Sequence, residues 1–171
     1  MKIKTMDIFL AVLMLLGVVC TQDRCSNNAS AAAQTKPVII EKYLEMGVQR
    51  SALIREYALL HYGKSNEKII PRMIVLHWTA ADNWEGTYNY FYPAENDSIE
   101  DGRLNVASHY LVARDGRIFQ LTPETMLNRH AIGYNWCAIG VENVGGVNGE
   151  EDLTEAQVKA NVALIRYLSG K

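Results

Sequence analysis

A histidine that closes one apolar run and a glutamate inside another are the side chains best suited to chemistry. His77 ends the run MIVLH, which begins at Met73, and stands immediately before a polar loop. An imidazole there can bind a divalent metal, act as a base or be a hydrogen-bonded, half-buried residue. Glu142 interrupts the run AIGVENV at 138–144. Because a buried carboxylate is costly unless paired or protonated, Glu142 either faces outward at a sheet edge or belongs to a site.

The remaining histidines have weaker claims when each is taken alone. His61 ends a predicted helix, where a histidine is favoured by the helix dipole. His109 lies in a predicted strand and is most simply a hydrogen-bonded core residue. His130 lies in a loop together with Tyr134 and Asn135, as a surface residue or a substrate contact.

Three stretches predict the strands that would position these side chains. Met73–Leu76 is a short continuous apolar run, typical of a strand buried on both faces. Val106–Leu121 predicts a β-hairpin, because Asp115 and Gly116 between two β-rich runs both tolerate positive φ. Ala138–Val144 predicts another short buried strand.

Helices are predicted on either side of these strands. One covers Ser51–Tyr62 and ends at Gly63. Thr154 caps the other, and its apolar face is expected to carry Val158, Val162, Ile165 and Leu168. The polar, aromatic stretch Asp82–Arg103 is expected to be a long loop. Strands flanked by helices predict an α/β fold with a central sheet.

Composition narrows the class of protein. The chain of 171 residues is expected to form one folded unit. Its net charge of −2 argues against a protein that wraps nucleic acid, which usually carries a basic excess. Three cysteines are too few for a disulfide framework.

The N-terminus predicts an export signal. Lys2 and Lys4 precede the apolar run Ile8–Val19, which is shorter than the ~20 residues of a membrane span. Two alternatives stay open, cleavage within Ala29–Ala33 and lipid attachment at Cys20. Either one exports the protein to the periplasm or the cell exterior, with residues 1–33 as signal peptide and polar spacer.

Three segments occur in a familiar order: IVLHWTA at 74–80, SHYLVARDGRIFQL at 108–121 and RHAIGYNWCAIGVENVGG at 129–146. Together they resemble the zinc-dependent N-acetylmuramoyl-L-alanine amidases, whose superfamily includes phage amidases and peptidoglycan recognition proteins. The resemblance implies a single α/β domain at 71–171, with a mixed central sheet flanked by helices. Residues 34–70 would be an N-terminal helical segment and linker.

The resemblance also implies an activity, a metal and its ligands. The activity is hydrolysis of the amide between N-acetylmuramic acid and L-alanine in peptidoglycan or muropeptides, by a monomer. His77 matches the first Zn²⁺ ligand and Glu142 the catalytic glutamate. His130 matches a substrate-side histidine, and His109 a histidine behind the ligands.

Cleft residues follow from the same match. Tyr134 and Asn135 would line the substrate cleft together with His130, and the aromatic stretch Asn83–Tyr92 would form its rim.

One departure from the family pattern concerns the metal. The second and third zinc ligands of the family follow the last helix, whereas this chain stops at Lys171. We therefore expect the C-terminal part of the domain to be missing and the chain to hydrolyse muropeptides poorly. Two alternatives remain, a non-catalytic peptidoglycan-binding module and a self-contained metal site of His77, His109 and His130, since three histidines suffice for zinc.

Overall fold

The computed structural model describes residues 36–97 and 102–171. The predicted export signal at 1–33 and the alternative lipid site at Cys20 lie outside the described residues. The described residues form one compact unit. No described helix is both long enough and apolar enough to cross a membrane.

A five-stranded mixed sheet forms the centre of the fold. Its strand order is β1-β4-β3-β5-β2; the β3–β4 pair is antiparallel and the other pairs are parallel. The strands are β1 (Ile39–Glu41), β2 (Met73–Trp78), β3 (Tyr110–Val112), β4 (Ile118–Gln120) and β5 (Ala138–Asn143). The mixed α/β sheet and the hairpin around Asp115 and Gly116 are confirmed, with Gly116 at φ 85°.

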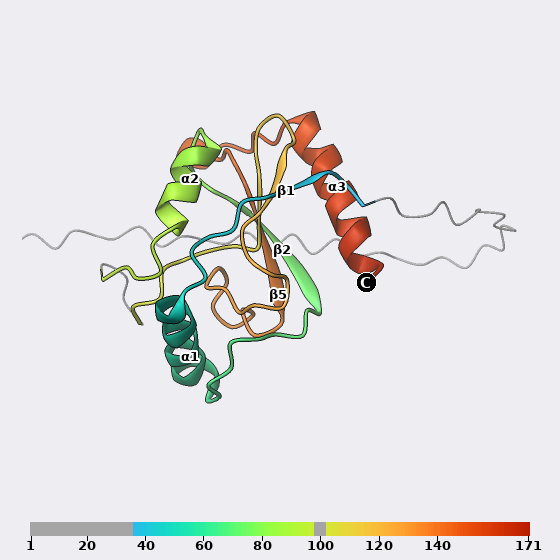
Figure 1. Cartoon of the computed structure of the whole chain (residues 1–171). Helices are drawn as coiled ribbons and strands as arrows, with labels where there is room; N and C mark the ends of the chain where they lie inside the picture. Colours follow the sequence, from blue (N-terminus) through green and yellow to red (C-terminus); the bar gives the residue numbers. More distant parts are fainter. Residues whose placement is uncertain (1–35, 98–101) are drawn as a thin grey trace, which may run out of the picture. The chain divides into compact units, whose positions relative to one another are not determined.

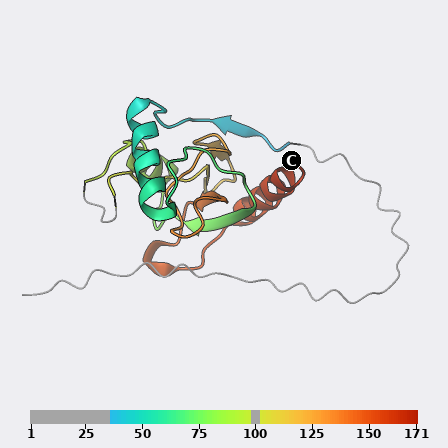
Figure 2. The ribbon, with the colours of Figure 1, turned by 90° about the horizontal axis from the view of Figure 1, so that it is seen from below.

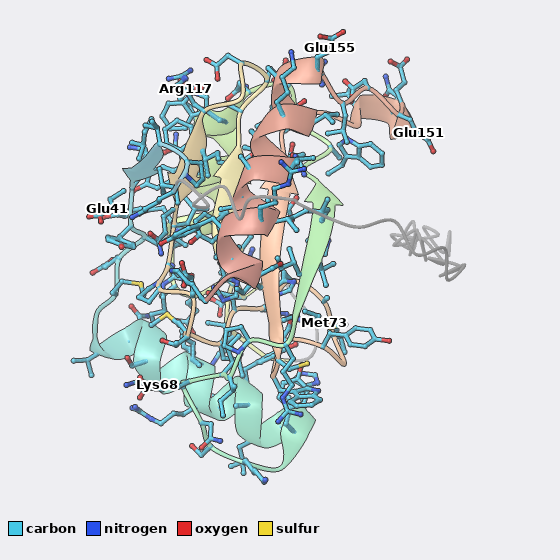
Figure 3. The ribbon with its side chains drawn as sticks, turned by 90° about the vertical axis from the view of Figure 1, so that its right-hand side faces the viewer. Glu41, Lys68, Met73, Arg117, Glu151 and Glu155 are labelled. Carbon is cyan, nitrogen blue, oxygen red and sulfur yellow. The ribbon has the colours of Figure 1, made fainter. Side chains whose placement is uncertain are left out.

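The edges of the sheet differ from the expectation. β1 was not predicted, because a three-residue strand leaves little pattern. It pairs with β4, so the sheet includes a strand that precedes the expected domain start at residue 71. β2 forms the opposite edge, beginning at Met73 (Figure 3). The prediction that β2 is buried on both faces is therefore wrong: Leu76 is 45% exposed and Trp78 38%.

The first helix, α1 (Val48–Tyr62), begins three residues before the predicted start and ends as predicted. Gly63 adopts φ 69° and its backbone N–H donates to Leu59 O, so the helix ends in a left-handed residue that glycine adopts without strain. Ile54 and Tyr57 are almost fully buried in the cluster beneath this helix. α1 and α2 lie on one side of the sheet and α3 on the other (Figures 1 and 2).

The predicted loop Asp82–Arg103 contains a helix, α2 (Trp84–Phe91), so that prediction is wrong. Asn83 caps the helix, since its side-chain oxygen accepts from the backbone N–H of Gly86. The Trp84 ring stacks on Phe119 of β4, with 4.4 Å between centroids. Of the aromatic residues expected to form the rim of a cleft, Trp84, Tyr88 and Phe91 pack against the core. Tyr90 and Tyr92 are exposed.

The last helix, α3 (Glu155–Ser169), has the predicted cap but a different buried face. The Thr154 side chain accepts from Gln157 N–H, and the Gln157 side chain accepts from Thr154 N–H. Val158 and Val162 are 49% and 42% exposed. The buried residues are Gln157, Ala160, Asn161, Leu164 and Leu168.

Polar contacts to the sheet explain this rotation of α3. Gln157 Nε2 donates to the carbonyl oxygens of Val112 and Val144, at 3.3 and 2.8 Å. Asn161 Nδ2 donates to Asn143 Oδ1 at 2.6 Å. The helix therefore places two hydrogen-bonded amides rather than two valines against the sheet.

Candidate active site

His77 and Glu142 are brought together by the pairing of β2 with β5. The two residues are direct partners in this parallel register. Because laterally paired residues of a sheet project from the same face, both side chains lie on one face. Ile139 and Val141 of β5 pack toward α3, so the alternate residue Glu142 faces the opposite side.

Glu142 belongs to an internal strand, since β5 lies between β3 and β2. The alternative of an outward-facing carboxylate at a sheet edge is therefore wrong. Its Oε2 is buried and has no hydrogen-bond partner in the described part of the chain. Burial raises the pKa of Glu142 from 4.5 to about 7, because the charged form loses its hydration. A carboxyl with this pKa can accept or release a proton near neutral pH.

His77 contacts a second imidazole. Its Nε2 lies 3.1 Å from Nδ1 of His130, and the two rings meet edge to face with 5.2 Å between centroids. Burial lowers the pKa of His77, which favours the neutral ring. No hydrogen bond to Nδ1 of His77 occurs among residues 36–97 and 102–171.

His130 packs on the sheet through a glycine. A Cβ on Gly140 would lie 2.7–2.9 Å from three atoms of the His130 ring, closer than side chains approach one another. His130 Nε2 lies 3.2 Å from the carbonyl oxygen of Ala138. Burial, followed by the neighbouring rings of His109 and His77, lowers the pKa of His130 to about 3.

Asn135 shapes the loop that carries His130. Its Oδ1 accepts from the backbone N–H groups of His130 and Ala131, at 3.1 and 2.7 Å. Its Nδ2 donates to the Tyr57 hydroxyl of α1 at 3.0 Å. Asn135 is fully buried, so its burial does not fit the expected direct contact with substrate. Tyr134, by contrast, is 46% exposed and free to line a cleft.

His109 lies immediately before β3 and is fully buried. Its Nδ1 accepts from the backbone N–H of Gly140 at 3.0 Å, and its Nε2 lies 2.8 Å from Met126 O. Burial lowers the pKa of His109 to about 4. Backbone groups therefore engage both ring nitrogens of His109.

The arrangement provides one metal ligand. His109 and His130 have both nitrogens engaged, so the three-histidine alternative is not formed, and the described residues contain no group of three His, Cys, Asp or Glu placed to hold a metal. A catalytic zinc site needs three protein ligands and an open position. Nδ1 of His77 and the orphaned Glu142 oxygen fit one ligand and an adjacent base; the described residues do not fit a complete site.

Gly140 is the site residue that sequence reasoning missed. Its lack of a side chain leaves room for the His130 ring, and its backbone N–H donates to Nδ1 of His109. A signal was present, because a glycine inside a strand pattern marks either a bulge or a close approach by another group. Which group approaches depends on the loop at 129–137, and that could not be read from the strand alone.

Comparison with known proteins agrees with this geometry. The fold is a helix-covered mixed sheet with a histidine and a carboxyl side by side on one face. The model of the N-acetylmuramoyl-L-alanine amidase family matches residues 65–171, and the chain belongs to this family.

Phage endolysins are among the curated relatives. The Escherichia phage T7 endolysin is 34% identical over 76 residues, which are 42% of this chain and 50% of that protein. The Klebsiella phage KP32 endolysin is 34% identical over 70 residues, 39% of this chain and 46% of that protein. The chain thus spans about half the length of the curated relatives it matches.

Solved structures share the fold. The amidase LysCS from Clostridium intestinale is 27% identical with a TM-score of 0.52, over 80% of this chain and 76% of that one. Bumblebee PGRP-SA has a TM-score of 0.54 at 20% identity, over 78% and 75% of the two chains, and supports the fold alone.

Proposed function

We propose that the protein is a zinc-dependent peptidoglycan amidase that hydrolyses the amide between N-acetylmuramic acid and L-alanine of the stem peptide. The observation that carries the proposal is Glu142, whose buried, unpartnered Oε2 lies on an internal strand beside His77. A buried carboxyl oxygen without a partner is costly, and a protein that only binds its ligand has no need of it.

The proposed metal ligand and base have distinct tasks. Zinc held at His77, with further ligands of the family, would polarise the scissile carbonyl and lower the pKa of a bound water. Glu142 accepts the proton of the attacking water, because its pKa near 7 lies close to the operating pH. The same carboxyl then returns the proton to the leaving amine.

Substrate would be bound beside the loop that carries His130. Tyr134 and Trp136 of this loop are both half exposed. Trp136 also borders a cavity of about 220 Å³ with Lys64 and Lys68. The two ammonium groups suit the free carboxylates of a stem peptide, and the aromatic rings suit its apolar atoms. The proposed exported location fits, since peptidoglycan lies outside the inner membrane.

A second candidate function is a non-catalytic peptidoglycan-binding module. It is favoured by one observation, that the described residues supply one zinc ligand and not three. The two functions differ in the fate of the substrate: the amidase releases free stem peptide, whereas the module binds muropeptides unchanged.

The deciding experiment uses a version of the protein that supplies all three protein ligands of a catalytic zinc ion. Glu142→Gln keeps the size of the side chain but cannot accept a proton, so we expect turnover to fall ~100- to 10,000-fold while zinc binding survives. His77→Ala should remove metal and activity together. Glu151→Gln, at an exposed carboxyl, is the matched control. Mass spectrometry of released stem peptide and metal analysis separate the roles; a Glu142→Gln variant with more than about a tenth of the activity, against that expected loss, would contradict the proposal.

A further inference from the structure

A cavity of about 220 Å³ lies between the C-terminal end of α1 and the loop at 129–137. We propose that this cavity is a subsite for the C-terminal carboxylate of a short peptide, whose other end reaches His77 and Glu142. The identity of that peptide as a stem peptide rests on the proposed function, whereas binding of a peptide carboxylate does not.

The walls of the cavity are apolar and held in place. Ala58, Ile69 and Leu127 line it and are buried. The backbone N–H groups of Ile69 and Leu127 each donate at 2.8 Å to the segment opposite their own. Trp136 forms another wall, and its Nε1 donates to Gly133 O at 3.0 Å, which fixes the half-exposed ring. A preformed pocket of this kind loses little freedom when a ligand enters it.

Three cations border the cavity without a counter-ion in the described part of the chain. Lys64 and Lys68 line it and are exposed, and the guanidinium of Arg72 lies 5.9 Å from the ring centroid of the tryptophan wall. None of the three forms an ion pair within residues 36–97 and 102–171. Glu67, the carboxylate beside Lys68, is engaged by an arginine of α1. A local positive excess in a chain of net charge −2 indicates an anionic ligand.

The walls and the charges together select a carboxylate on a small apolar residue. Free phosphate would place strongly hydrated oxygens against the side chains of Ala58, Ile69 and Leu127, at a cost in desolvation. A terminal residue with a short apolar side chain fills the same space, while its carboxylate lies toward the two lysines. An amidated or cationic peptide end would gain nothing from them.

The position of the cavity along the strands sets the length of the peptide. Arg72 N–H donates to Cys137 O at 2.8 Å, where β2 and β5 begin, whereas His77 and Glu142 are paired near the far ends of these strands. Arg72 and His77 are five positions apart, which is about 16 Å at the usual rise of a strand. An extended peptide of about four to six residues spans this distance. α1 lies on the side of the sheet away from α3, which is also the side of His77 and Glu142 (Figures 1 and 2).

Titration of the 171-residue chain with alanine peptides tests the subsite, with the indole N–H of Trp136 followed by ¹H–¹⁵N NMR. We expect N-acetyl-tetraalanine with a free carboxylate to shift this signal. It should bind ~10-fold more tightly than the same peptide with a C-terminal amide, because two ammonium groups attract the carboxylate. Added salt should weaken binding of the carboxylate form and leave that of the amide nearly unchanged.

Two double variants assign the effect to the cavity. Lys64→Gln combined with Lys68→Gln should abolish the difference between the two peptides. Lys36→Gln combined with Lys159→Gln removes the same charge at exposed positions elsewhere and should preserve the difference. Equal affinity of the two peptides, an unshifted Trp136 signal, or inorganic phosphate bound as tightly as the carboxylate peptide would overturn the subsite.

Muropeptides separate this inference from the proposed function. If alanine peptides bind as expected but muropeptides are neither bound nor cleaved, the proposed function fails and the subsite stands. If muropeptides with free and amidated carboxylates are bound or cleaved equally well, the subsite fails and the proposed function stands.

Discussion

His77 and Glu142 lie opposite each other across the parallel pair of β2 and β5, on the face of the sheet away from α3. The strand backbones set the separation of the two side chains, because no loop intervenes between them. Sites built on strands are held more tightly than sites on loops, which would suit the proposed ligand and base.

Zinc binding of the 171-residue chain is expected to be weak and to depend on His77. One imidazole does not form a closed site, and three protein ligands are the rule for catalytic zinc. Equilibrium dialysis followed by elemental analysis measures this directly, with His77→Ala as the comparison and His61→Ala as the matched control on α1. Stoichiometric zinc that survives dialysis and His77→Ala would show that another part of the chain provides the site.

The stability of the fold should carry a signature of Glu142. Burial raises the pKa of Glu142 to about 7 in the folded state. Below the ordinary pKa of 4.5 the carboxyl is protonated in both states and does not lower the free energy of unfolding. As pH rises through 7, the carboxyl lowers the free energy of unfolding, because the unfolded chain ionises first. The shift corresponds to about 3 kcal/mol lost from the free energy of unfolding above pH 7. Glu142→Gln should therefore gain stability relative to the parent between pH 5 and pH 8, as measured by urea unfolding. If the difference in free energy of unfolding between Glu142→Gln and the parent does not change with pH, the carboxyl titrates normally.

The buried histidines His109 and His130 should make the free energy of unfolding rise with pH, opposite to the effect of Glu142. The pKa values of His109 and His130 are lowered to about 4 and about 3, so the unfolded chain binds protons first as pH falls below ~6.5. Stability is then present above the unfolded pKa and is lost on acidification. The Glu142→Gln variant should show this acid limb unchanged, and a flat profile between pH 4 and 6.5 would contradict the neutral rings.

Gly140→Ala is expected to destabilise the fold and displace His130. The added methyl group would lie 2.7–2.9 Å from the His130 ring, and forcing extra volume into a packed site typically costs ~1–3 kcal/mol. Thermal unfolding and the His130 NMR signals report the two effects. Gly47→Ala, whose nearest heavy atom is 3.7 Å away, is the control and should cost less, as expected for a helix N-cap.

The buried face of α3 can be tested with two alanine variants. Leu164 is fully buried, so Leu164→Ala should lower the free energy of unfolding by ~2–5 kcal/mol. Val162 is 42% exposed, so Val162→Ala should change it by less than ~1 kcal/mol. Equal losses at the two positions would restore the sequence-based assignment of the apolar face.

Features with a local cause were predictable from the sequence. Gly63 ends α1, Thr154 caps α3, and Asp115 with Gly116 turns the β3–β4 hairpin, because each depends on residues within a few positions. The edge position of β2 and the rotation of α3 depend on partners far along the chain. α2 was not predicted because its packing depends on a contact with β4, the stacking of Trp84 on Phe119, which is distant in sequence.

The site divides in the same way. His77 and Glu142 could be singled out because one ends an apolar run and the other interrupts one. The hydrogen bonds of His130 to Ala138 and of Asn135 to Tyr57 involve backbone groups and a distant helix, for which the sequence carries no local mark. Asn135 was expected to contact the substrate, but its side chain is buried and hydrogen-bonded to His130, Ala131 and Tyr57.

The parallel pairing of β2 with β5 also ties the chemistry to the folding reaction. Asn143 Nδ2 donates to His77 O across 66 positions of sequence. Contacts of such long range form only after a large loop has closed, and the entropy lost in that closure makes their formation slow. Such contacts therefore depend on folding of the whole domain. No early or partly folded form with β2 unpaired can hold His77 and Glu142 in register. The two side chains therefore come together only in the final folded state, and their separation on heating or in denaturant should coincide with global unfolding.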